Sequence, residues 1–367
     1  MLAILIVLIL ILGIVLYTCF FLNQPQFGSI AKGERRTLIE NSPNFKNGQF
    51  QNLSPTTPLS EGTTMLGVLK EYMFSKDKRV IPPSLLPAHK TDLHELDPHE
   101  DVLVWFGHSS YFMQIMGKKI LVDPVLCGYA SPVSFTTRSF KGSDIYCCDD
   151  IPDIDFLFIT HDHYDHLDYN TVTQLRSRVS KVITGLGVGA HLERWGYSKD
   201  QIIEKDWNED VEPEPGFRIH TVPTRHFSGR KFSRNKTLWL SFALITPHLR
   251  IYIGGDSGYD THFKKTGTEL GPFDLAILEN GQYDKSWKHI HMQPEDVVVA
   301  AEDLLAKRLL PVHWSKFSLA LHAWDDSITR VLKHAQVHNI PVLHPMIGEP
   351  VSLKNPSANN EWWKLLN

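Results

Sequence analysis

The sequence predicts an α+β domain of two packed β-sheets with helices outside, preceded by an N-terminal transmembrane helix. Strand-like runs mixed with helical patterns extend over about 250 residues of the chain. The first 22 residues contain no charged side chain. Of the 367 residues, 42% are hydrophobic and 21% are charged, so the chain can bury a large core.

The apolar segment 1–22 reads MLAILIVLILILGIVLYTCFFL. Its length matches the ~20 residues that cross ~30 Å of hydrocarbon. No Lys or Arg precedes it and no small-residue cleavage site follows it, which favours a retained single-pass anchor; a cleaved signal peptide is the alternative. The first basic residues, Lys32, Arg35 and Arg36, follow the segment, which predicts a cytoplasmic location for the rest of the chain.

Composition divides the remainder into three parts. Residues 23–100 are rich in Pro, Asn, Gln, Ser and Thr and are predicted to be a linker and N-terminal extension, with one short helix at 65–74. Residues 101–350 contain the strand and helix patterns expected of a folded domain, and 351–367 form a predicted C-terminal tail.

Within 101–350 the expected elements follow from local patterns. The apolar run DFLFIT at 155–160 is typical of a buried strand, and Pro294 suits the first turn of a helix. We expect helices at 169–179 and 294–307. We expect strands at 102–106, 111–116, 119–123, 155–160, 181–184, 217–222, 238–246, 250–254, 275–279 and 309–313.

The motif with the clearest chemistry directly follows DFLFIT. It reads HDHYDH, from His161 to His166, in a chain with 19 histidines. Several adjacent buried imidazoles would be costly as mere packing, whereas imidazoles and carboxylates are good ligands for Zn²⁺ and related divalent cations. Alternate residues of this turn can point to one side. His161 and His163 are therefore expected to serve one metal, and Asp165 and His166 a second.

Further ligands are expected at the ends of other apolar runs. His226 follows the run at 217–222, Asp256 follows 250–254, and His313 follows 309–312. Asp256 is suited to bridge two cations, because its carboxylate has two oxygens. Asp123, at another strand end, is expected either to hydrogen-bond a ligand histidine or simply to end the strand before Pro124.

These residues, with GHSS at 107–110, LVDP at 121–124, YIGGDS at 252–257 and PVHW at 311–314, resemble the metallo-β-lactamase superfamily. Within it they are similar to the branch that contains N-acylphosphatidylethanolamine-hydrolysing phospholipase D and its bacterial relatives. The resemblance implies an αββα sandwich, in which two packed mixed β-sheets are flanked by helices. It implies one metal held by His161, His163, His226 and Asp256 and a second held by Asp165, His166, Asp256 and His313.

The resemblance also implies an activity and cofactors. The chain is expected to be a zinc-dependent hydrolase with two Zn²⁺, with Fe or Mn left open. It is expected to act as a phospholipase D-type phosphodiesterase that releases N-acylethanolamine and phosphatidic acid from N-acylphosphatidylethanolamine. The expected catalytic residues are Asp165 and His291, a family histidine that lines the site and can protonate the leaving oxygen or act only through a metal ligand.

Two other functions stay open. The same metals would serve a lactonase or carboxylic-ester hydrolase, and the fold could be a non-catalytic membrane-tethered scaffold. The expected partners are a membrane phospholipid substrate and the bilayer, and the sequence leaves a homodimer open. The net charge of −4 argues against a nucleic-acid partner.

Two residue groups near the motif have competing interpretations. A basic group could meet an anionic headgroup, but a solvated loop is favoured: Arg225, Arg230, Lys231, Arg234 and Lys236. An aromatic group could line an acyl-chain path or belong to the core: Phe227, Phe232, Trp287, Trp314 and Phe317.

Overall fold

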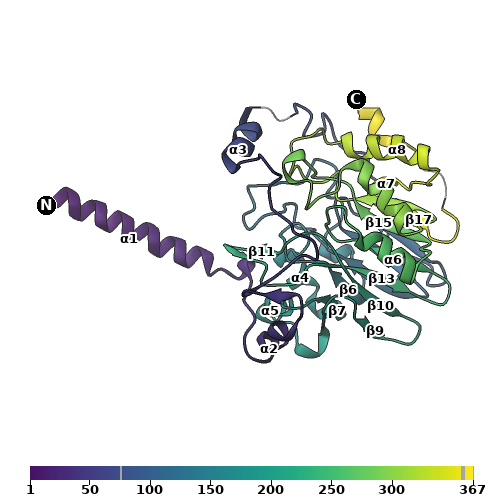
Figure 1. Cartoon of the computed structure of the whole chain (residues 1–367), viewed down its shortest axis with the longest axis horizontal. Helices are drawn as coiled ribbons and strands as arrows, with labels where there is room; N and C mark the ends of the chain where they lie inside the picture. The colour runs from purple at the N-terminus through teal and green to yellow at the C-terminus, as the bar shows by residue number, and fades with distance from the viewer. Residues whose placement is uncertain (75–76, 357–359, 367) are drawn as a thin grey trace.

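A computed structural model of the chain describes residues 1–74, 77–356 and 360–366. Figure 1 shows two β-sheets packed together with helices on their outer sides, and one long helix, α1 (Leu2–Leu22), that projects away from them. This confirms the predicted αββα architecture and its N-terminal helix. The predicted C-terminal tail includes residues 357–359 and 367, which lie outside the described residues. The predicted domain boundaries stay predictions.

The first sheet has seven strands in the order β17-β3-β4-β5-β6-β7-β8. Pairing is antiparallel from β17 to β5 and parallel from β5 to β8, so the sheet is mixed. Its strands are β3 (Val102–Trp105), β4 (Tyr111–Ile115), β5 (Lys118–Val122), β6 (Ile154–Ile159), β7 (Val179–Gly185), β8 (Ile202–Lys205) and β17 (Pro350–Ser352).

The second sheet has six strands in the order β16-β15-β14-β13-β10-β9. Pairing is antiparallel from β9 to β14 and parallel from β14 to β16. Its strands are β9 (Asp210–Val211), β10 (Arg218–Pro223), β13 (Leu240–Ile245), β14 (Arg250–Ile253), β15 (Leu275–Glu279) and β16 (Leu309–Val312).

The continuous apolar run of β6 is explained by burial on both faces. Phe158 points to the second sheet, where its ring stacks on Phe242 of β13 with ring centroids 4.8 Å apart. Leu157 and Ile159 point the other way, into a cluster with Val172. Strand side chains alternate between faces, so a strand covered on both sides must be apolar throughout.

Helices cover the two outer faces. On the first sheet lie α4 (Tyr169–Leu175) and α5 (Gly189–Arg194), and on the second lie α6 (His262–Leu270), α7 (Pro294–Asp303) and α8 (Asp326–His338). The helix predicted at 169–179 is wrong in its length. It ends at Leu175, and a 3₁₀ turn, Arg176–Arg178, leads into β7.

The segment 23–100 is packed on the domain, with Phe27, Ile39, Phe50 and Leu86 buried. It contains α2 (Gly33–Asn41), the hairpin of β1 (Phe45–Lys46) and β2 (Gln49–Phe50), and α3 (Met65–Phe74). The last of these confirms the predicted short helix. A further hairpin, β11 (Gly229–Arg230) and β12 (Ser233–Arg234), lies beside the inner end of α1 in Figure 1.

The residues directly after α1 are fixed to the domain by side chains that bind their backbone. Trp195 Nε1 donates to Pro25 O (2.7 Å), Arg194 Nη1 to Gly28 O (2.9 Å) and Arg230 Nη2 to Gln26 O (2.6 Å). The 23–29 segment is therefore part of the packed surface rather than a free linker, and α1 leaves the domain from a fixed point.

Candidate metal centre

The HDHYDH residues occupy the turn between β6 and α4. His161 Nε2 lies 2.9 Å from His163 Nδ1, and His226 Nε2 lies 3.2 Å from the same atom. His226 reaches this point from the loop after β10. Together with Asp256, these three histidines place their ligand atoms within 4.8 Å of one another. The structure thus brings together the residues predicted for the first metal.

Hydrogen bonds on the far side of each ring set which nitrogen faces this group. His226 Nδ1 donates to Ile290 O (2.8 Å). His161 Nδ1 donates to Thr160 Oγ1 (3.0 Å), whose own proton goes to Asp123 Oδ2 (2.6 Å). Burial lowers the pKa of His161 and of His226 far below the usual imidazole value, so each ring is neutral at neutral pH. Each therefore presents a lone pair on Nε2, as a metal ligand does.

Asp256 lies between this group and the second one. Its Oδ2 is 3.2 Å from His166 Nε2 and 3.7 Å from His226 Nε2, while its Oδ1 is 3.4 Å from His313 Nδ1. The chain reaches this position through Gly254 and Gly255 after β14. A Cβ atom at Gly255 would lie 2.6 Å from Leu240 O, so only glycine fits. The geometry suits the bridging role, which stays a prediction.

The second group contains Asp165, His166 and His313, as predicted, and also His108. His166 Nδ1 donates to Asp123 Oδ2 (2.8 Å), which confirms that Asp123 hydrogen-bonds a predicted ligand histidine. His108 Nε2 lies 2.9 Å from Asp165 Oδ2. The GHSS motif was recognised in the sequence, but no role was predicted for His108. Its position just before a strand could have indicated that it belongs to the site.

These two groups fit divalent cations. Among the described residues, the buried atoms His166 Nε2 and Asp256 Oδ1 have no hydrogen-bond partner. Burying an uncompensated carboxylate costs several kcal/mol. A cation would satisfy both atoms at once, and neutral imidazoles with carboxylates are the donors that first-row divalent metals prefer.

His291 lies beside both groups, with its ring centroid 5.0 Å from that of His226 and 5.4 Å from that of His313. Its Nδ1 is 3.2 Å from Oε2 of Glu279, a residue at the end of β15 that sequence reasoning missed. Burial disfavours the imidazolium, but the nearby carboxylates of Glu279 and Asp256 outweigh it and raise the pKa of His291 to about 9. Burial in turn raises the pKa of Glu279 to about 7.

A cavity of about 370 Å³ opens over the two groups. Its polar floor contains His163, Asp165 and Asp256. Its walls are largely apolar and include two residues of α3; the apolar lining is Pro58, Leu59, Met65, Val68, Phe227, Trp287, Ile290 and Leu319. No side chain of α3 is buried among the residues described, so this helix borders the cavity with an uncovered surface.

The basic and aromatic residues singled out in the sequence lie in different parts of the structure. Phe227 and Trp287 line the cavity over the two groups, Trp314 and Phe317 belong to the buried core, and Phe232 is exposed. Of the basic residues, Arg234 lines the same cavity; Arg225, Arg230, Lys231 and Lys236 do not. The expectation of a merely solvated loop is wrong for Arg230, which is buried and binds three backbone carbonyls.

Comparison with known proteins indicates the same protein family as the fold and the two candidate ligand groups do. The profile of the Beta-lactamase superfamily domain matches residues 118–314. The chain belongs to the metallo-β-lactamase superfamily and is a metal-dependent hydrolase of that family. Candidate metal-ligating clusters of His, Asp and Glu agree with this assignment.

The chain is also similar to several individual proteins of this family. The chain is 36% identical to an uncharacterised protein of Mycobacterium tuberculosis over 90% of each chain. It is 32% identical to N-acyl-phosphatidylethanolamine-hydrolyzing phospholipase D 1 of Caenorhabditis elegans, over 66% of this chain and 72% of that protein. Among solved structures, Igni18, a metallo hydrolase of Ignicoccus hospitalis, has a TM-score of 0.54 at 22% identity, over 68% of this chain and 97% of that one.

The shared position of Asp256 predicts unequal effects of two substitutions on metal content. Asp256→Asn should lower the occupancy of both groups, because the charged carboxylate lies 3.7 Å from His226 Nε2 in the first group and 3.2 Å from His166 Nε2 in the second. His226→Ala should affect mainly the first group and leave about one ion per chain. Elemental analysis of both variants checks this, with Asp260→Asn as a control four residues away. Full metal content and normal turnover in Asp256→Asn would contradict the bridging role.

Glu279 is predicted to hold the proton on His291. Replacement by Gln removes the negative charge that stabilises the imidazolium, so the pKa of His291 should fall by about one unit or more. Titration of the His291 ring by ¹⁵N NMR measures this directly. Glu295→Gln, on the surface of α7, is the matched control and should leave the titration unchanged; an equal titration in Glu279→Gln would show that Glu279 has no such role.

Proposed function

We propose that the chain is a phospholipase D-type phosphodiesterase that hydrolyses N-acylphosphatidylethanolamine to N-acylethanolamine and phosphatidic acid. The observation that carries the proposal is the cavity that joins the two ligand groups to an apolar wall. A phosphodiester with acyl chains needs both features next to each other. The activity in the name of the Caenorhabditis elegans relative supports the same substrate class.

Two Zn²⁺ are the proposed cofactors, because imidazole-rich sets completed by carboxylates favour this ion. When bound, such a pair supplies the positive charge that activates water and offsets the charge of a phosphodiester. The residues that would hold the first ion are His161, His163, His226 and Asp256, and those for the second are Asp165, His166, His313 and Asp256. His108 supports the second group through Asp165.

His291 is the proposed proton donor. In this reaction an oxygen of water bonds to phosphorus, the phosphorus–oxygen bond to N-acylethanolamine breaks, and the leaving oxygen takes a proton. His291 lines the cavity, and Glu279 contacts its Nδ1, which leaves Nε2 for the substrate. Its raised pKa keeps the ring protonated at neutral pH, as a general acid requires.

The acyl chains would lie against the apolar wall. Met65 and Val68 bring α3 into that wall, and other side chains of α3 are exposed, among them Leu66, Met73 and Phe74. A helix with apolar side chains on its outer surface is suited to contact lipid at the mouth of the cavity. The substrate could then move between the bilayer and the cavity along this helix.

We also propose that α1 anchors the domain to a membrane. By length and composition, this helix is long and apolar enough to cross a membrane. Its segment Ile4–Leu22 is not buried against the rest of the chain. Lys32, Arg35 and Arg36 follow it, which favours a cytoplasmic domain. The four cysteines are free, as in a reducing compartment.

A product assay tests this function. The full chain in mixed micelles should release N-acylethanolamine and phosphatidic acid in equal amounts from N-acylphosphatidylethanolamine. His291→Asn should lower the rate by about 10²–10⁴-fold, the usual contribution of a general acid. Lactones and carboxylic esters belong in the same panel. Ring-opened lactone without phosphatidic acid would instead identify a lactonase, and no turnover of any substrate by metal-loaded protein would favour a scaffold.

A further inference from the structure

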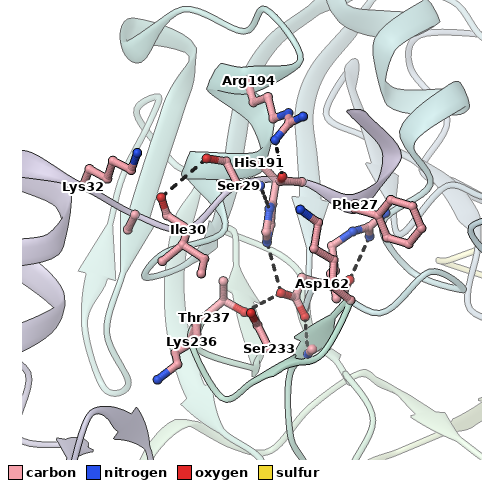
Figure 2. A pocket seen from close by; sticks show the side chains of 15 residues that line it. Phe27, Ser29, Ile30, Lys32, Asp162, His191, Arg194, Ser233, Lys236 and Thr237 are labelled. Carbon is pink, nitrogen blue, oxygen red and sulfur yellow. Dashed lines mark hydrogen bonds and ion pairs between the residues drawn. The ribbon is translucent and has the colours of Figure 1, made fainter. Parts of the chain in front are cut away.

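A second cavity, of about 240 Å³, lies next to the end of α1 and shares no lining residue with the catalytic cavity. It is formed by the segment after α1, by α5 and by the β11–β12 hairpin (Figure 2). The lining residues that matter for the argument are Phe27, Ile30, Lys32, Arg194, Lys231 and Lys236. We propose that this cavity binds the headgroup of an anionic phospholipid of the membrane that holds α1. The proposal rests on that anchor and does not depend on the reaction.

The lining is strongly cationic. The lining contains five Lys or Arg side chains and a single carboxylate, that of Asp162. The charge of Asp162 is already compensated, because Oδ1 accepts from Gly229 N (2.7 Å) and Oδ2 accepts from Thr237 Oγ1 (2.9 Å) and His191 Nε2 (3.1 Å). Figure 2 shows these contacts below His191. The carboxylate therefore does not cancel the positive charge of the cavity.

Two of the cations are available to a ligand. The other three already have partners: Arg230 and Arg194 donate to backbone carbonyls, and Lys236 donates to Gly48 O (2.6 Å). Within the described part of the chain, the side chains of Lys32 and Lys231 have no ion pair. Burial and the nearby guanidinium of Arg194 lower the pKa of Lys231, as expected where positive charges gather without an anion.

Acidic residues near the cavity do not neutralise these lysines. Glu193, next to Arg194 in α5, and Glu204 of β8 both pair with Arg35 of α2. Glu34 lies 3.6 Å from Lys199 Nζ. The local charge thus favours an anion with at least one phosphate-like group, which accepts hydrogen bonds from several donors at once.

The position of the cavity selects a lipid rather than a soluble anion. Phe27, in the cavity wall, contacts Phe21 in the last turn of α1 with ring centroids 5.1 Å apart. Lys231 Nζ lies 6.0 Å from the Phe27 ring. Because residues 23–29 are fixed to the domain, the cavity stays directly beyond the apolar span. That depth is where phospholipid headgroups lie.

One exposed apolar side chain lines the cavity, and another lies between two of its lining residues in the chain. Ile30 is 51% exposed, and Phe232, between Lys231 and Ser233 at the tip of the hairpin, is 87% exposed. An aromatic side chain beside a cation is typical of residues at a membrane interface. These two side chains would contact the glycerol and upper acyl chains of a lipid whose headgroup occupies the cavity.

Binding of a short-chain lipid tests the proposal. The full chain in an uncharged detergent is titrated with dihexanoyl phosphatidylglycerol, with dihexanoyl phosphatidylcholine and with inorganic phosphate, and bound molecules are counted by native mass spectrometry. Phosphatidylglycerol should saturate one site. The Lys32→Gln/Lys231→Gln variant should bind it roughly tenfold or more weakly, since it lacks the two cations that attract an anionic lipid.

Two controls separate the cavity from other sites. Lys264→Gln/Lys333→Gln removes two exposed charges on α6 and α8 and should bind as the unchanged chain does. His226→Ala alters the catalytic cavity and should also retain binding, so a failure of the proposed reaction would leave this result standing. Equal binding of phosphatidylcholine, equal binding of inorganic phosphate, or full binding by the Lys32/Lys231 variant would each overturn the proposal, and a melting curve of each variant verifies its folding.

Discussion

The buried carboxylate of Asp256 is the constraint on which the site depends. It is 3% exposed and lies among His161, His166, His226 and His313. Three of these rings are kept neutral by burial and do not balance its charge, whereas the carboxylates of Asp256 and Asp165 raise the pKa of the fourth, His166. Cations are the partners that make such an arrangement favourable. The two sheets serve this end by bringing strand ends from distant parts of the chain to one point.

The fold also fixes the point at which α1 joins the domain. The residues after α1 are bound by Arg194, Trp195 and Arg230, and Arg230 also holds the carbonyls of Asp162 and Leu167 around the HDHYDH turn. One buried guanidinium thus joins the segment after the apolar helix to the turn that carries the ligands. The segment after α1 and the turn that carries the predicted ligands therefore share a rigid support, as the proposed membrane anchor and lipid substrate would require.

The sequence predicted most of the site because its ligands either adjoin one another or end apolar strands. His161 to His166 belong to the first kind, and Asp256 and His313 to the second. His108 and Glu279 were missed, since their roles depend on contacts with Asp165 and His291, which lie in loops elsewhere in the chain. The short helix α5 and the cavity beside it were also beyond sequence reasoning, because that cavity is made by three segments that meet only after folding.

The most direct test of the account is the metal content of the full chain purified without chelators. Elemental analysis should find about two first-row divalent ions per chain, and zinc should predominate. Removal by a chelator should abolish hydrolysis, and zinc should restore it. A chain that holds no transition metal, or that hydrolyses its substrate equally well without one, would contradict the account.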